Sequence, residues 1–180
     1  MNNNSNISEI SAFRLCNTCS ACQDVCSKQA ITYEETIGGY YVSSVDKNLC
    51  VKCGTCISVC PGTGFNEHLL NSLPDDPFVG NALGAFVGKA QDKVIYRNSQ
   101  SGGLVSALLT FGLEQLGLTG ALTVAMVAGS PPQPTPKIAR TKTEIIQSQK
   151  LKYCPIPLLC ILDQLEQSDG PMAVVGLLHT

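Results

Sequence analysis

Polar and apolar positions alternate on either side of a glycine pair in the first third of the chain. The alternation covers residues 30–35 and 40–45, and Gly38 and Gly39 lie between the two segments. A period of two around a glycine turn is typical of a β-hairpin. We therefore predict two paired strands here, joined at residues 36–39.

Longer apolar runs alternate in the second half of the chain, where they predict helices and strands in turn. Gly117 ends the first helical run, and Thr143 is the candidate cap of the second. The expected elements are helices at residues 104–116, 143–149 and 157–167 and strands at residues 120–127 and 172–177. Helices that alternate with apolar strands indicate an α/β layer.

Prolines interrupt this pattern at residues 130–136. Proline has no backbone N–H, so this segment cannot form a helix or a central strand. A loop is therefore predicted there, followed by a short strand at residues 137–140.

Composition divides the chain into four segments. Residues 1–12 are polar and are expected to form a mobile leader, and residues 13–64 form a cysteine-rich module. Residues 65–90 lack a clear period and contain a turn-rich stretch, which predicts a linker. Residues 91–180 carry the α/β pattern.

Two cysteine runs of the same form lie on either side of the predicted hairpin. Both have the spacing C-x2-C-x2-C-x3-C, and Pro61 follows the second run, as is typical of bacterial ferredoxins. A cubane iron–sulfur cluster takes three thiolates from one such loop and a fourth from elsewhere. The duplication of loop and short helix predicts a pseudo-symmetric fold with two clusters.

In two-cluster ferredoxins the fourth cysteine of each run ligates the other cluster. This rule predicts the ligands of both clusters. One cluster is assigned to Cys16, Cys19, Cys22 and Cys60, and the other to Cys50, Cys53, Cys56 and Cys26.

Zinc and disulfides are the alternatives for these cysteines. Structural zinc uses two separated pairs of ligands, which two runs of four do not resemble. Disulfides belong to secreted chains, and residues 1–15 show neither the basic start nor the apolar core of a signal peptide. Iron–sulfur clusters are therefore favoured, and with them the reducing cytoplasm as the location.

Charge and hydropathy argue against two classes of partner, nucleic acid and the membrane interior. The 180 residues carry a net charge of -2, and only 14% are charged. No basic stripe is present, which argues against nucleic acid as a partner. The longest apolar stretch, residues 102–118, is interrupted by Glu114 and Gln115, so no membrane span is predicted.

The remaining reactive side chains form no recognisable motif. Cys154 and Cys160 lie outside both runs, and buried structural thiols are favoured over a third cluster. His68 and His179 have no partner motif. No catalytic residue is predicted.

One segment is specific enough to indicate a family. Residues 97–109, Arg-Asn-Ser-Gln-Ser-Gly-Gly-Leu-Val-Ser-Ala-Leu-Leu, follow the two-cluster module. This arrangement resembles the coenzyme F420 hydrogenase/dehydrogenase beta subunit family, and matching segments at residues 113–121, 139–146 and 151–153 follow in the family's order. The resemblance covers most of residues 14–178.

The resemblance implies an iron–sulfur flavoprotein. Members pass electrons between clusters and a flavin, and in the name-giving members the flavin exchanges hydride with the deazaflavin coenzyme. The partners implied are coenzyme F420 or another small acceptor, together with a redox protein or other subunits. The expected fold is α+β: a bacterial-type ferredoxin module with two [4Fe–4S] clusters, followed by an α/β domain.

The resemblance also implies where FAD would bind. Glycines at a helix start let a pyrophosphate approach unpaired backbone N–H groups. The residues assigned to the cofactor are Asn98, Ser99, Gln100, Ser101, Gly102, Gly103, Lys152 and Tyr153. The alternatives are a plain turn capped by Ser101 and a surface loop at residues 152–153.

Residues 174–180 depart from the family, which has Val-Gly-x-Pro-Cys and a further region at this point. A truncated α/β domain is therefore expected, with FAD held by a longer form. Two functions follow as hypotheses. The chain is an oxidoreductase subunit that connects two clusters to a flavin, or it is a ferredoxin-like electron carrier or docking module with no substrate of its own.

Overall fold

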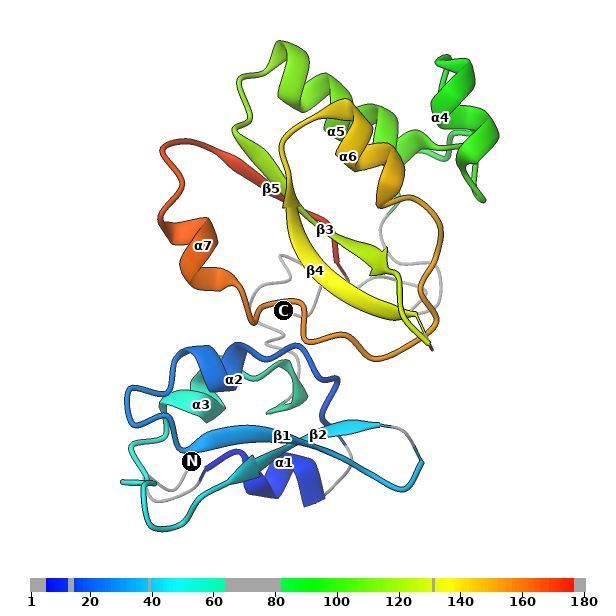
Figure 1. Cartoon of the computed structure of the whole chain (residues 1–180). Coiled ribbons are helices and arrows are strands. Elements are labelled where there is room, and N and C mark those ends of the chain that lie inside the picture. The colour runs from blue at the N-terminus through cyan, green and yellow to red at the C-terminus, as the bar shows by residue number, and fades with distance from the viewer. Residues whose placement is uncertain (1–5, 13–14, 39, 64–81, 131, 177–180) are drawn as a thin grey trace.

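A computed structural model describes residues 6–12, 15–38, 40–63, 82–130 and 132–176. The chain folds into two halves that lie one above the other (Figure 1). We call residues 15–63 the cysteine module and residues 82–176 the α/β half. Mixed helix and strand content agrees with the expected α+β class.

The cysteine module is built on the predicted hairpin. Strand β1 (Ile31–Glu35) pairs antiparallel with β2 (Tyr41–Val45), with Ile31 opposite Val45. Two single-turn helices, α2 (Ala21–Asp24) and α3 (Thr55–Ser58), lie on one side of the hairpin (Figure 1). A short 3-10 helix, η1 (Pro61–Thr63), follows. The hairpin prediction is confirmed.

The two cysteine loops have matching backbones. Ser20 and Gly54 precede α2 and α3 with left-handed φ angles of 68° and 81°. Two residues earlier in each loop, Thr18 and Lys52 are also left-handed, at 61° and 54°. A left-handed conformation costs an ordinary residue about 1–2 kcal/mol. Its repetition at equivalent positions supports the predicted duplication.

The predicted mobile leader is wrong for residues 6–12. Ser8–Ala12 form helix α1, which lies on the side of the hairpin away from α2 (Figure 1). Ile7 is only 1% exposed, and Ile10 packs against the same core of Ile7, Ile31 and two cysteines. Two isoleucines spaced three apart in a polar segment anchor it by burial. Residues 1–5 lie outside the described ranges.

The α/β half contains a three-stranded sheet of order β4-β3-β5. The central β3 pairs antiparallel with β4 and parallel with β5. The elements are α4 (Lys93–Asn98), α5 (Leu104–Gln115), β3 (Gly120–Val127), β4 (Gln133–Ala139), α6 (Lys142–Gln147), α7 (Leu162–Glu166) and β5 (Met172–Val174). Helices α5 and α6 lie on the side of the sheet away from the cysteine module (Figure 1).

The core of this half lies between the sheet and these two helices. Ala121, Ala139 and Ile145 are almost fully buried, and Leu109 and Leu113 of α5 pack against them. The bounds of α5 and β3 match the helix and strand predicted at residues 104–116 and 120–127. Both predictions are confirmed.

The loop predicted at residues 130–136 is wrong from Gln133 onward, where β4 begins. Pro134 and Pro136 face Met126 and Val124 of β3. Because β4 is an edge strand, residues two apart can both turn their backbone nitrogens away from the ladder, and proline costs no hydrogen bond there.

Two helix predictions also need correction. Helix α6 begins after Thr141, which caps it in place of Thr143. The helix predicted at residues 157–167 is helical only over α7. The residues before α7 instead contact the cysteine module: the N–H of Leu159 donates to the carbonyl of Cys19 at 3.0 Å.

The strand predicted at residues 172–177 is present as β5. The predicted linker lies outside the described residues at 65–81, and residues 82–90 form no helix or strand.

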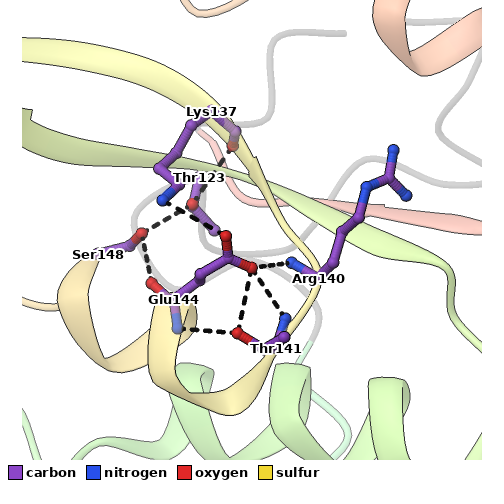
Figure 2. Close-up of polar contacts among 6 residues, drawn as sticks. All are labelled: Thr123, Lys137, Arg140, Thr141, Glu144 and Ser148. Carbon is purple, nitrogen blue, oxygen red and sulfur yellow. Dashed lines mark hydrogen bonds and ion pairs between the residues drawn. The ribbon is translucent and has the colours of Figure 1, made fainter.

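Glu144 connects the start of α6 to β4 (Figure 2). Its carboxylate accepts from the N–H of Arg140 at 2.8 Å and from the N–H of Thr141 at 3.1 Å. The hydroxyl of Thr141 accepts from the N–H of Glu144 in return, which completes a capping box. Further along α6, the hydroxyl of Ser148 lies 2.9 Å from that of Thr123 on β3.

We expect Thr141→Ala to lower the free energy of unfolding by about 1 kcal/mol, because one helix N–H loses its acceptor. Thr143→Ala is the matched control. This substitution makes the same chemical change two residues later, at an exposed position inside the helix. It should leave the free energy of unfolding unchanged. Thermal unfolding of the anaerobic protein, followed by circular dichroism, measures both. A larger loss for Thr143→Ala would contradict the assignment of the cap.

Candidate iron–sulfur centres

Four thiols from the two ends of the cysteine module lie close together beside α2. Burial, together with the neighbouring Cys19, Cys16 and Cys60, raises the pKa of the Cys22 thiol to about 11. Burial likewise raises the pKa of Cys60, and Cys19 and Cys16 again contribute. The last cysteine of the second run therefore joins the first three of the first run. We call these four residues the inner group.

The other four cysteines line a separate pocket. Cys26, Cys50, Cys53 and Cys56 surround it, with Lys28 and Lys52 at its rim. We call these four cysteines the outer group.

The thiols of the outer group differ in their environment. Burial raises the pKa of Cys56, and the nearby Cys53 adds to this. Cys53 itself is exposed, and a hydrogen bond with the hydroxyl of Thr55 lowers its pKa.

The two groups are those that the crossed ligand assignment requires, and the ligation itself stays a prediction. Helices α2 and α3 pack against each other, which brings the two loops side by side. In the described residues no three His, Cys, Asp or Glu side chains meet closely enough for a single metal ion. A cubane distributes its thiolates over four irons, so grouped thiols around a space fit such a cluster.

Several hydrogen-bond donors reach the cysteine sulfurs, and the sequence indicated none of them. Such bonds set the reduction potential of an iron–sulfur cluster. These contacts join Asn6 Nδ2 to Cys50 Sγ (3.6 Å), the Ala30 N–H to Cys26 Sγ (3.4 Å), Thr55 Oγ1 to Cys53 Sγ (3.4 Å) and the Tyr33 hydroxyl to Cys22 Sγ (3.6 Å). Tyr33 is half-buried, and burial and Cys22 together raise its pKa.

Three of the polar residues predicted to hold FAD, Asn98, Ser99 and Gln100, have hydrogen-bond partners within the protein. The amide of Asn98 donates to the carbonyl of Ile146 at 3.1 Å and to Gln149 Oε1 at 2.9 Å. Gln100 Oε1 accepts from the N–H of Leu151 at 2.6 Å. These contacts connect the end of α4 to the end of α6. The Ser99 hydroxyl donates to the carbonyl of Tyr96 at 2.8 Å.

The two glycines that follow are required by the local packing. Both are left-handed, with φ of 71° at Gly102 and 74° at Gly103. A Cβ on Gly103 would lie 2.9 Å from Ile95 Cγ2, and the carbonyl of Gly102 accepts from the N–H of Ala90 at 2.7 Å. Gly103, rather than Ser101, occupies the cap position of α5. Contact of this segment with FAD stays a prediction.

A large pocket lies between the two halves. The cysteine module contributes Cys16, Asn17, Thr18, Cys19, Ala21, Tyr40, Val59 and Pro61. The α/β half contributes Val105, Ser106, Leu109, Thr123, Val124, Ile145, Ser148, Lys150, Leu151, Lys152, Cys154, Pro155, Ile156, Leu158, Leu159, Val174, Val175 and Gly176. Residues 98–103 and Tyr153 are not among its described lining residues, and Lys152 is the one predicted FAD contact that lines it.

Lys152 is held in the wall of this pocket. Its Nζ donates to the carbonyls of Ser148 at 2.5 Å, Gln149 at 2.9 Å and Lys150 at 2.8 Å. These carbonyls follow the C-terminal end of helix α6, near which a positive charge is favourable. Burial lowers the pKa of Lys152. The three bonds identify Lys152 as a residue that shapes the pocket wall.

The prediction that Cys154 and Cys160 are buried structural thiols is wrong. Both are exposed, and Cys154 lines the large pocket. Both lie between α6 and α7, in a segment that forms no helix or strand. His68 and His179 lie outside the described residues.

Fold and cysteine arrangement define a class: an electron-transfer protein with a 4Fe–4S dicluster domain. Residues 15–63 match the model of that domain. Residues 85–163 match the N-terminal domain of the coenzyme F420 hydrogenase/dehydrogenase beta subunit. The chain thus carries matches to a 4Fe–4S dicluster domain and to the N-terminal domain of the coenzyme F420 hydrogenase/dehydrogenase beta subunit, and these matches confirm the resemblance found in the sequence.

Curated relatives include the coenzyme F420 hydrogenase subunit beta of Methanosarcina barkeri, which is 30% identical over 96 residues, or 53% of this chain and 33% of that protein. The subunit of the same name from Methanococcus voltae is 36% identical over 86 residues, or 48% of this chain and 30% of that protein. The ferredoxin-type protein NapF of Escherichia coli is 33% identical over 54 residues, or 30% of this chain and 33% of that protein.

The chain spans about a third of the length of these relatives. Among solved structures, the F420-reducing [NiFe] hydrogenase complex of Methanosarcina barkeri contains a chain with 26% identity and a TM-score of 0.44, covering 48% of this chain and 30% of that one. In the described ranges no helix is long and apolar enough to cross a membrane.

We expect Tyr33→Phe to lower the reduction potential of one cluster. A donor to a ligand sulfur favours the more negative, reduced state, and a net hydrogen bond of about 1 kcal/mol corresponds to about 40 mV for a one-electron couple. Tyr41→Phe, in the paired strand, is the control because its hydroxyl contacts no cysteine sulfur in the described structure. Redox titration followed by electron paramagnetic resonance measures both variants. An equal shift in the two variants would contradict a role for the Tyr33 hydroxyl.

Proposed function

We propose that this chain is an oxidoreductase subunit in which two [4Fe–4S] clusters exchange electrons with FAD bound between the two halves. The observation that carries the proposal is the shared pocket. Cys16 and Cys19 of the inner group line one side of it, and α5 and β3 line the other. A flavin placed there would be adjacent to a cluster.

The walls of the pocket suit a large planar ring. Val105, Leu109 and Val124 provide apolar surface from the α/β half. Pro155 and Leu158, in the irregular segment between α6 and α7, add further apolar surface. Apolar walls with a few polar groups are typical of cofactor sites, because they exclude water and bury most of the ligand.

The polar groups at the edge of the pocket have separate tasks. Lys152 holds the end of α6 in place through its three carbonyl contacts. Lys150 is exposed at the rim and offers a cation to the anionic part of a cofactor. When bound, the clusters would carry single electrons, and the flavin would convert them into hydride for a two-electron acceptor.

The acceptor proposed is coenzyme F420 or a related small molecule. Two of the relatives are named as beta subunits of coenzyme F420 hydrogenase, and this supports the proposal. The same names support other subunits or a redox protein as partners. The alternative is an electron carrier or docking module with no substrate of its own. The similarity to the ferredoxin-type protein NapF, which extends over 54 residues, supports this alternative.

Anaerobically purified protein should contain about eight iron atoms and about eight labile sulfides per chain, as two cubanes require. Paired substitutions then test the crossed ligands. Cys16→Ser with Cys60→Ser should leave one cluster intact and about half the iron, because both residues serve the same cluster. Cys16→Ser with Cys26→Ser should damage both clusters. The reverse pattern of iron content would show that each run binds its own cluster, and stoichiometric zinc without sulfide would exclude clusters altogether.

Against the expectation that only a longer form holds FAD, the shared pocket predicts that FAD binds to this chain, and the fluorescence of FAD should be quenched as the pocket fills. Ser106→Phe should weaken this binding tenfold or more, equivalent to about 1.4 kcal/mol, because it places a ring inside the pocket. Leu108→Phe is the control, since Leu108 is on the same helix but is 61% exposed and lies outside the pocket. Both variants should keep the iron content. Equal FAD affinity in Ser106→Phe and the unaltered protein would reject the pocket, and no FAD binding at all would favour the electron-carrier alternative.

A further inference from the structure

The two cysteine groups differ in how the rest of the chain covers them. Cys16 and Cys19 of the inner group face the α/β half, and the N–H of Leu159 reaches the carbonyl of Cys19 at 3.0 Å. No cysteine of the outer group lines that shared pocket. Cys53 is instead exposed to solvent. The segment that carries Leu159 lies between the sheet and the module beside α2 (Figure 1).

Equivalent positions in the two loops show the same asymmetry. Thr18 is only 3% exposed, and its hydroxyl donates to the carbonyl of Tyr41 at 2.7 Å. Its counterpart Lys52 has the same left-handed backbone but an exposed side chain. The first loop is therefore packed into the molecule, and the second presents a cation at its surface.

The charged residues that line the pocket of the outer group are all basic. Lys28 and Lys52 line its pocket and are exposed, and the described lining residues include no Asp or Glu. Val51, between Cys50 and Lys52, is 62% exposed. An apolar centre with a charged rim is the composition of a small protein–protein interface, and electron-transfer encounters are at the small end of interface size.

We propose that the outer group is the port through which electrons pass between this chain and an acidic one-electron carrier protein, and that Lys28 and Lys52 dock that carrier. The inference rests on the proposed function for the presence of clusters. In the step, one electron would leave the reduced centre of the carrier and reduce a cluster held by the outer group, and no atom would be transferred. A cluster held by the inner group would then lie between the port and the shared pocket.

Complementary charge acts mainly on the rate of encounter and makes it depend on salt. The rate of electron transfer from a reduced acidic ferredoxin should therefore fall as ionic strength rises. Lys28→Glu with Lys52→Glu should lower the second-order rate constant at low salt at least tenfold and remove its dependence on salt. Stopped-flow absorbance of the clusters measures this directly and needs no flavin.

Lys93→Glu is the matched control. It makes, at an exposed position on α4 in the other half, the same change of charge as each of the two single substitutions, and should leave the rate within twofold of the unaltered protein. A small cationic donor, the methyl viologen radical, gives a second control. Its rate should stay the same or increase in the double variant, because it needs no docking surface.

Three results would overturn the port. They are an unchanged ferredoxin rate in the double variant, an equal loss in Lys93→Glu, and a parallel loss with methyl viologen, which would place the lysines in tuning the cluster rather than in docking. If the Glu double variant loses iron, the double variant Lys28→Gln with Lys52→Gln is used in its place. For that variant we expect a smaller decrease in the ferredoxin rate constant and in its dependence on salt. Failure of FAD to bind would refute the proposed flavin site and leave this test unaffected.

Discussion

The burial of several thiols side by side is the constraint on which the rest of the structure depends. Burial and three neighbouring cysteines raise the pKa of Cys22 to about 11, so the thiol is protonated at neutral pH when no metal is bound. Thiolate ligands must lose these protons, which couples cluster assembly to pH and to folding. The apolar core of the module consists of little more than Ile7, Ile31 and two cysteines. A core this small usually needs a metal centre for stability.

The α/β half completes the surroundings of the inner group. The Leu159 contact with Cys19 connects a segment late in the chain to the first cysteine loop. That segment contains Pro155 and Pro157 and stays irregular until α7, which leaves the backbone N–H of Leu159 available to bond across the two halves. The outer group receives no such cover. One duplicated motif therefore yields two sites with different access to solvent, and this difference underlies the proposed path for electrons.

The most specific segment of the sequence has a structural task in this fold. Asn98 and Gln100 connect the end of α4 to the end of α6, and Gly103 allows α5 to pass close to Ile95. These contacts place α5 and the end of α6 at the wall of the shared pocket. A sequence pattern of this kind can shape a cofactor site without contacting the cofactor, by positioning the elements that line the site.

The sequence alone determined the features that depend on local spacing. The hairpin, α5, β3 and the grouping of cysteines into runs follow from periods of two residues, helical runs and ligand spacing, which act over a few residues. Tertiary structure decided what depends on distant partners. Pro134 and Pro136 are acceptable in β4 only because it is an edge strand, and Ile7 is anchored only because a core lies beneath α1. The covering of one cysteine loop and the exposure of the other also required the folded chain, because two loops of equal spacing differ only in what packs against them.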